Sequence, residues 1–247
     1  MFNHELTHQY QPIVDMLTLE LLRHEALLRI DGIDDIEEFT RCVEASGDII
    51  KLDLITLESV IRHLALSNFR SSLPVAINVS PISLASREFQ AKAIDMLRQR
   101  PSPLDVSVEI TEASPITEMA GTKEFIQKLK RLGCTVGMDD YGDGFTRLDL
   151  VDELQLDYLK LSGRLTQDVL ITDSAMSHVI EAIEFARSRG VFVVAEHIDN
   201  IPQYHAFRNL GVEQGQGWLF AKADALIEEP EQFQQSLRLR INDEGGA

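Results

Sequence analysis

The stretch EMAGTKEFIQKLKRLGCTVGMDD, residues 118–140, holds one complete helix-to-strand unit and indicates the fold class. Its apolar residues first recur at helical spacing, which predicts a helix over Glu118–Leu132, and Gly133 is the residue type that most often ends a helix. The short apolar run Thr135–Met138 then predicts a buried strand. The aspartate pair Asp139-Asp140 follows that strand directly.

The same alternation of short apolar runs and longer amphipathic segments continues along the chain. The predicted strands are Glu25–Ile30, Val75–Val79, Val106–Thr111, Thr135–Met138, Tyr158–Leu161, Val191–Ala195 and Gly217–Phe220. The predicted helices include Leu52–Leu66, Ser86–Arg98, Glu118–Leu132, Ser174–Arg189 and Pro202–Leu210. Repeated strand-then-helix order implies parallel pairing with right-handed crossovers. An earlier run, Tyr10–Thr18, is joined to the first unit by a short turn, so we expect it to pair antiparallel.

Two α/β architectures fit this alternation: a closed (β/α)8 barrel of the TIM type and an open doubly wound sheet. The doubly wound sheet requires a glycine-rich phosphate loop after its first strand, and EALLRIDGIDD, residues 25–35, contains none. An unbroken series of seven or eight units favours the barrel, which typically needs about 250 residues. We therefore predict one barrel domain over residues 1–247 with an antiparallel first strand.

The composition argues against several classes of protein. A formal net charge of −17 is unsuited to coating a nucleic-acid polymer, because phosphate contacts need clustered lysine and arginine. No run approaches the roughly 18 consecutive apolar residues of a membrane span, and the first residues lack a signal-peptide pattern. The two cysteines, Cys42 and Cys134, have neither disulfide nor metal-site spacing. We therefore expect a cytoplasmic protein.

Polar residues recur where the predicted strands end, and in a barrel all these ends meet at the face that carries active sites. Taken singly, each is better explained as a helix cap or a surface residue than as a site residue. Together they form an oxygen-rich set suited to Mg²⁺ or Mn²⁺, namely Glu25, Asn78, Glu109, Asp139, Asp140 and Glu196. Five carboxylates call for two cations, a pair that can activate water for phosphoryl displacement. Lys160 would hold or deprotonate that water, its pKa lowered by neighbouring cations.

These residues also lie in motifs that resemble, in order, those of the EAL-domain family. The matching segments are QPIVD at 11–15, EALLR at 25–29, INVS at 77–80, VEITE at 108–112, DDYGDG at 139–144, YLKL at 158–161, AE at 195–196 and QGWLF at 216–220. Each motif alone is modest evidence, whereas the ordered set covers nearly the whole chain. The resemblance implies a phosphodiesterase that hydrolyses cyclic di-GMP to the linear dinucleotide pGpG.

The resemblance also implies a role for each residue at the site. Glu25, Asn78, Glu109 and Asp139 would hold one Mg²⁺ or Mn²⁺, and Asp139 would bridge to a second ion held by Asp140 and Glu196. Calcium would inhibit, because its irregular coordination need not position the water. The catalytic groups would be Lys160, Glu25, Glu196 and Gln216. Substrate would contact Gln11, Leu27, Arg29 and Asp140, and Glu112 would anchor the loop after Asp139-Asp140.

Four positions depart from the family pattern: Asp143 replaces threonine, Ser162 aspartate, His197 glycine and Asp199 glutamate. We expect Asp143 to join a metal shell or to repel the substrate phosphates, and Ser162 to remove a hydrogen-bond acceptor near Lys160. These changes predict reduced activity. They leave open a non-catalytic module that binds cyclic di-GMP or a protein partner as a signalling receptor.

A further implication of the resemblance is a symmetric homodimer formed through the helix after Asp139-Asp140, at about Arg147–Leu154. An apolar stripe on this segment is suited to either the core or a twofold interface. It comprises Phe145, Leu148, Leu150, Val151 and Leu154.

Overall fold

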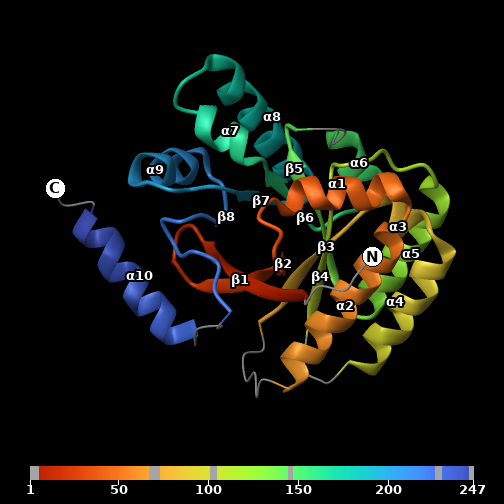
Figure 1. Cartoon of the computed structure of the whole chain (residues 1–247). Helices are drawn as coiled ribbons and strands as arrows, with labels where there is room; N and C mark the ends of the chain where they lie inside the picture. Colours follow the sequence, from red (N-terminus) through yellow and green to blue (C-terminus); the bar gives the residue numbers. More distant parts are fainter. Residues whose placement is uncertain (1–5, 67–72, 101–104, 144–146, 226–229, 245–247) are drawn as a thin grey trace.

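The structure is a computed structural model that describes residues 6–66, 73–100, 105–143, 147–225 and 230–244. Within these residues the strands form a closed barrel in chain order (Figure 1). The strands are β1 (Leu6–Asp15), β2 (Leu21–Ile30), β3 (Val75–Val79), β4 (Val106–Ile110), β5 (Thr135–Tyr141), β6 (Tyr158–Leu161), β7 (Phe192–Ala195) and β8 (Gln214–Gly215). The predicted barrel is confirmed.

Strand β1 runs antiparallel to both of its neighbours, β2 and β8. The other neighbouring pairs, from β2–β3 to β7–β8, are parallel. The antiparallel first strand predicted from its short turn is therefore confirmed. As a result, the C-terminal ends of β2 to β8 open at one mouth of the barrel.

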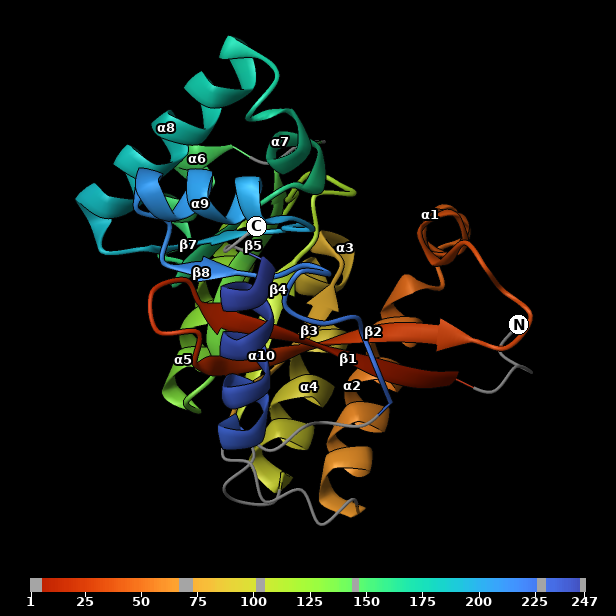
Figure 2. The same cartoon turned by 90° about the vertical axis from the view of Figure 1, so that its left-hand side faces the viewer.

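Helices surround the barrel, and α10 lies on the opposite side from α2 and α4 (Figures 1 and 2). Their bounds are α1 (Ile36–Ser46), α2 (Ile49–Leu66), α3 (Pro81–Ala85), α4 (Arg87–Gln99), α5 (Met119–Arg131), α6 (Leu148–Glu153), α7 (Gly163–Asp168), α8 (Asp173–Arg189), α9 (Ile201–Leu210) and α10 (Pro230–Glu244). None of the described helices combines the length and apolarity needed to cross a bilayer.

Helix α5 illustrates how the sequence produces each outer layer. Its buried side chains recur every three or four residues, at Thr122, Phe125, Ile126 and Leu129, so one helix face packs on the barrel. After the helix, Gly133 adopts a φ of 84°, a left-handed conformation that glycine reaches without strain. The predicted helix-to-strand unit is thus present.

The barrel interior is filled below the mouth by Ile13, Tyr158 and Val194. A methyl group added at Gly137 would lie 2.2 Å from the Tyr158 ring, so a side chain at that position would collide with the phenol. Glycine on β5 therefore makes room for the aromatic plug. The plug closes the interior beneath the polar residues of the mouth.

The predicted strand Gly217–Phe220 is wrong, because the last strand is β8, three residues earlier in the chain. Gly217 has a φ of 156°, and the amide of Phe220 donates to the Gly217 carbonyl at 3.1 Å, which closes a turn. The apolar Trp218-Leu219-Phe220 run resembles a strand in composition. Its backbone instead bends against Ile198, whose carbonyl accepts from the amide of Leu219 at 3.0 Å.

Candidate active site

The strand register brings the predicted site residues together at the barrel mouth. Asn78 on β3 pairs with Glu109 on β4, and Glu25 on β2 lies opposite Ala76 of β3. Because side chains alternate along a strand, Glu25, Asn78 and Glu109 project to the same side of the sheet. Glu25 and Glu109 are buried and Asn78 is partly buried.

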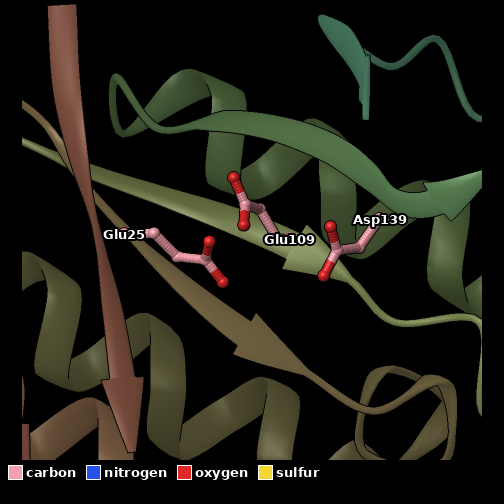
Figure 3. A group of neighbouring side chains, drawn as sticks. All are labelled: Glu25, Glu109 and Asp139. Atoms are coloured by element: carbon pink, nitrogen blue, oxygen red, sulfur yellow. The ribbon is translucent and has the colours of Figure 1, made fainter. Parts of the chain in front are cut away.

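Two groups of carboxylates lie close enough to share a metal ion. Glu25, Glu109 and Asp139 form one group, and Asp139, Asp140 and Glu196 form the other, each with oxygens within 4.8 Å of one another. Figure 3 shows the first group pointing toward a common centre from β2, β4 and β5. Asp139 belongs to both groups, which is the position expected of a bridging ligand.

The ammonium group of Lys160 lies among these carboxylates and is fully buried. Its Nζ atom is 3.1 Å from Glu25, 3.0 Å from Glu109, 2.8 Å from Asp139 and 2.7 Å from Glu196. Burial alone would lower the pKa of Lys160, but the four carboxylates outweigh it and raise that pKa well above its usual value. The carboxylates thus raise the pKa of Lys160, whereas the cations expected from the sequence would lower it. In this structure Lys160 is therefore an ammonium group that donates hydrogen bonds.

The carboxylates respond to the same crowding. Burial raises the pKa of Glu109 and that of Asp139 to about 7 each, even though Lys160 opposes the shift. Burial also raises the pKa of Glu196 well above its usual value. For Glu25, burial is outweighed by Lys160 and by hydrogen bonds from Gln216 and Asn78, so its pKa is lowered. Lys160 alone therefore does not offset the cost of ionising Glu109, Asp139 and Glu196 together.

The backbone at the aspartate pair departs from regular strand geometry. The β5–β6 register shifts between Met138 and Tyr141. Asp140 between them has a φ of 51°, an uncommon conformation for a residue with a side chain. Such a bulge redirects side chains at a sheet edge. Burial and the nearby Glu112 raise the pKa of Asp140 to about 6, with Lys160 opposing them.

Two amide side chains complete the mouth. Asn78 donates through Nδ2 to Glu25 at 2.7 Å, and Gln216 donates through Nε2 to the other Glu25 oxygen at 2.8 Å. The Asn78 Oδ1 atom is buried with no hydrogen-bond partner among the described residues. An unpaired buried oxygen is costly unless something binds it. A cation among the carboxylates would supply that partner.

Three of the four predicted substrate residues lie on the β1–β2 ribbon, and the fourth, Asp140, lies on β5. Gln11 is opposite Glu25 and accepts from Gln216 at 3.2 Å. Leu27 and Arg29 follow Glu25 at every second position, so all three share one face of β2. Arg29 donates through Nε to Gln9 at 2.8 Å, which fixes the direction of its guanidinium group. These residues are therefore grouped beside the acidic centre.

Three of the four departures from the family pattern, Asp143, Ser162 and Asp199, make local polar contacts. The Asp143 carboxylate pairs with Arg164 at 2.6 Å. The sequence analysis expected Asp143 to join a metal shell or to repel the substrate phosphates, and it did not predict this ion pair. Ser162 accepts from the Leu165 amide at 3.3 Å and caps α7. His197 has a φ of 51°, and Asp199 accepts from the Trp218 amide at 3.0 Å.

Tyr158 contacts the site and was missed by the sequence analysis. Its hydroxyl donates to one Glu109 oxygen at 2.8 Å, while Lys160 donates to the other at 3.0 Å. Arg23 stacks over the Tyr158 ring, 4.1 Å from its centroid. The signal was available, because Tyr158 precedes Lys160 by two residues and must share its face of the strand.

The helix expected at Arg147–Leu154 is present as α6, Leu148–Glu153. Val151 and Leu154 are buried in the core, and Leu148 and Leu150 pack against it in part. Phe145 of the predicted stripe and Gly144 of the DDYGDG segment lie outside the described residues. The stripe therefore serves mainly the core.

Comparison with known proteins identifies this arrangement. The family model described as "EAL domain" matches residues 2–223. The chain belongs to the EAL domain family. The EAL domain is 26% identical over 213 residues to cyclic di-GMP phosphodiesterase PdeF of Escherichia coli (strain K12), covering 83% of this chain and 28% of PdeF. It is 28% identical over 235 residues to cyclic di-GMP phosphodiesterase PA2567 of Pseudomonas aeruginosa, covering 93% of this chain and 39% of that protein.

Among solved structures, this EAL domain is similar to "PaMucR Phosphodiesterase, c-di-GMP complex", with a TM-score of 0.77 and 22% identity. The match covers 89% of this chain and 92% of that one. This likeness supports the barrel fold. The chain spans less than half the length of the two curated relatives above.

Proposed function

We propose that this chain is a divalent-cation-dependent phosphodiesterase that hydrolyses cyclic di-GMP to linear pGpG. The observation that carries the proposal is the pair of acidic groups joined at Asp139, with Lys160 between them. Membership of the EAL domain family and the cyclic di-GMP phosphodiesterase activity in the names of its relatives support the substrate.

The residues present fit a pair of Mg²⁺ or Mn²⁺ ions. Oxygen donors are the type these ions prefer, and the unpaired Asn78 Oδ1 adds a neutral donor to the first acidic group. One ion would be held by Glu25, Asn78, Glu109 and Asp139, and the other by Asp139, Asp140 and Glu196. When bound, the ions would activate water and offset the charge of the phosphoryl oxygens.

The chain's own side chains would do the rest. Lys160, held as an ammonium by its carboxylate neighbours, would donate a hydrogen bond that orients the attacking water. Gln216 would fix Glu25 through the 2.8 Å hydrogen bond already present. Arg29 is suited to a substrate phosphate, because its planar fork can make paired contacts. Gln11 and Leu27 would line the same side of the substrate.

Incubating the chain with cyclic di-GMP and Mg²⁺ or Mn²⁺ tests the proposal. We expect chromatography to detect linear pGpG. With Ca²⁺ alone we expect binding but little product, since Ca²⁺ is a larger ion with a less regular coordination geometry. Binding without product in Mg²⁺ and Mn²⁺ would favour a signalling receptor. Full turnover in Ca²⁺ alone would contradict the water-positioning role of the cations.

The receptor is the second candidate, and Ser162 favours it. Its hydroxyl caps α7 at a position where the family has a carboxylate near Lys160, so one acceptor for the lysine or its water is missing. The two candidates differ in kcat rather than in affinity.

We further propose that the chain is a cytoplasmic single-domain unit that forms a homodimer through α6. Sedimentation of the chain with and without ligand would measure the dimer content.

Replacing Tyr158 by phenylalanine should weaken Mg²⁺ or Mn²⁺ binding about tenfold, because outer hydrogen-bond partners tune ligand carboxylates by this order. The variant removes the 2.8 Å hydrogen bond to Glu109 and keeps the ring that fills the barrel. Calorimetric titration with Mn²⁺ measures the effect. Tyr204→Phe is the matched control, since its hydroxyl donates to the Met16 carbonyl. Equal affinity in the Tyr158 and Tyr204 variants would show that Tyr158 only fills space.

A further inference from the structure

Three of the four departures from the family pattern meet at the first turn of α7. Ser162 caps that turn, and Arg164 within it pairs with Asp143. A methyl group added at Gly163 would lie 2.7 Å from Nδ1 of His197, so the imidazole sits directly against the glycine. The first turn of α7 thus contacts the loop after β5 and the loop after β7.

The last residue of β5 and the first two residues of the loop after it, 141–143, all contact this turn. The Ser162 amide donates to the Tyr141 carbonyl at 3.0 Å. A methyl group added at Gly142 would lie 2.3 Å from a Leu165 methyl, so the two segments are in close contact. Arg164 then donates to the Gly142 carbonyl at 2.5 Å and pairs with Asp143 at 2.6 Å.

The glutamate expected to anchor this loop faces unfavourable charge in the same region. Burial raises the pKa of Glu112, and Asp139 and Asp143 add to the shift by repulsion. The carboxylate at position 143 repels that of Glu112, so Glu112 is poorly suited to anchor this loop. A cationic side chain is better suited, because Asp143 attracts it. Arg164 supplies that cation from the first turn of α7.

We propose that Arg164 is a positioning residue that anchors the loop after Asp140 to α7, through the Gly142 carbonyl and the Asp143 carboxylate, in place of Glu112. Asp139 and Asp140 lie immediately before the anchored residues. Arg164 therefore acts on the placement of Asp139 and Asp140 through the residues that it holds. The inference deepens the proposed function, because it assigns what holds one side of the acidic site.

Charge reversal tests the anchor without a large loss of stability, since an exposed ion pair contributes little to it. Arg164→Glu would repel Asp143, and Arg164→Glu combined with Asp143→Arg would restore attraction. Arg41→Glu is the matched control, because Arg41 and Arg164 are similarly exposed, 65% and 64%, and Arg41 pairs with Glu38 on α1. Thermal unfolding checks that all variants remain folded.

Hydrogen exchange is the first readout, because it does not depend on activity. The amides of Asp143 and Ser162 are bonded to the carbonyls of Asp140 and Tyr141. Both amides should exchange faster in Arg164→Glu. Their exchange rates should return toward the wild-type values in the double variant with Arg164→Glu and Asp143→Arg. Unchanged exchange in Arg164→Glu would overturn the anchor.

Cation affinity and turnover are the second readout. Arg164→Glu should lower Mn²⁺ affinity or kcat about tenfold, the order expected when an outer partner of a metal site is lost. Faster exchange with both quantities unchanged would overturn the positioning role. If the wild type shows no turnover, the proposed function fails, whereas exchange and Mn²⁺ affinity still decide on the anchor.

Discussion

Asp139→Asn should abolish turnover, with a loss greater than the roughly 10–100-fold that removal of an outer hydrogen-bond partner costs at a metal site. Asp139 is the residue shared by both acidic groups. Asparagine keeps the shape of the side chain but removes the charge that would serve both cations. Product formation at saturating Mg²⁺ measures the effect, with the exposed Asp173→Asn as the control.

The same variant separates loss of function from loss of folding. Burial raises the pKa of Asp139 to about 7, so the ionised carboxylate is poorly accommodated without cations. Asparagine should therefore leave the thermal midpoint of the metal-free protein equal or higher, while abolishing the rise that Mg²⁺ produces by binding the native state. Near-normal turnover in Asp139→Asn would disprove the bridging assignment.

The sequence was sufficient for the barrel because its signals are local. Apolar runs such as Val75–Val79 and Tyr158–Leu161 coincide with β3 and β6, and the residues at their ends face a common mouth by topology alone. The error at Gly217–Phe220 has a tertiary cause. The backbone there folds against Ile198, a contact that apolar composition does not encode.

The candidate site was predictable as a set of residues but not as a network. Alternation and strand ends placed Glu25, Glu109 and Lys160 together, whereas the four ion pairs of Lys160 require the closed barrel. The bulge at Asp140 arises from pairing between β5 and β6. The partner of Asp143 is 21 residues away in sequence, at Arg164, and lies in a helix the sequence analysis did not predict.

Lys160→Met should lower kcat by about 10²-fold or more, within the range expected for a positioned proton donor or acceptor. It should also tighten Mn²⁺ binding to the substrate-free protein. The ammonium group now occupies the centre of four carboxylates and competes with cations for their negative charge. Methionine fills similar space without that charge, so the two readouts are expected to move in opposite directions.

The metal-free variant gives an independent check through pH. Removing one partner of a buried ion pair costs about 3–5 kcal/mol when the other charge remains ionised. The pKa values of Glu109 and Asp139 are already raised to about 7, and they should rise further without Lys160. A protein that contains acids whose pKa is raised by folding becomes less stable as the pH rises. The free energy of unfolding of Lys160→Met should therefore fall further below that of the wild type at pH 8 than at pH 6.

Two results would assign Lys160 a different role. Parallel losses of Mn²⁺ affinity and kcat would make it a structural cation that keeps the carboxylates in place. A raised KM with unchanged kcat would make it a substrate contact, because an interaction equal in ground and transition states changes binding alone. Lys92→Met is the control, since Lys92 pairs with Glu88 on the exposed face of α4. The proposed role of Lys160 requires both tighter cation binding and slower turnover in Lys160→Met. In that role, bound cations displace the ammonium group from the carboxylates, and the ammonium group then orients the attacking water.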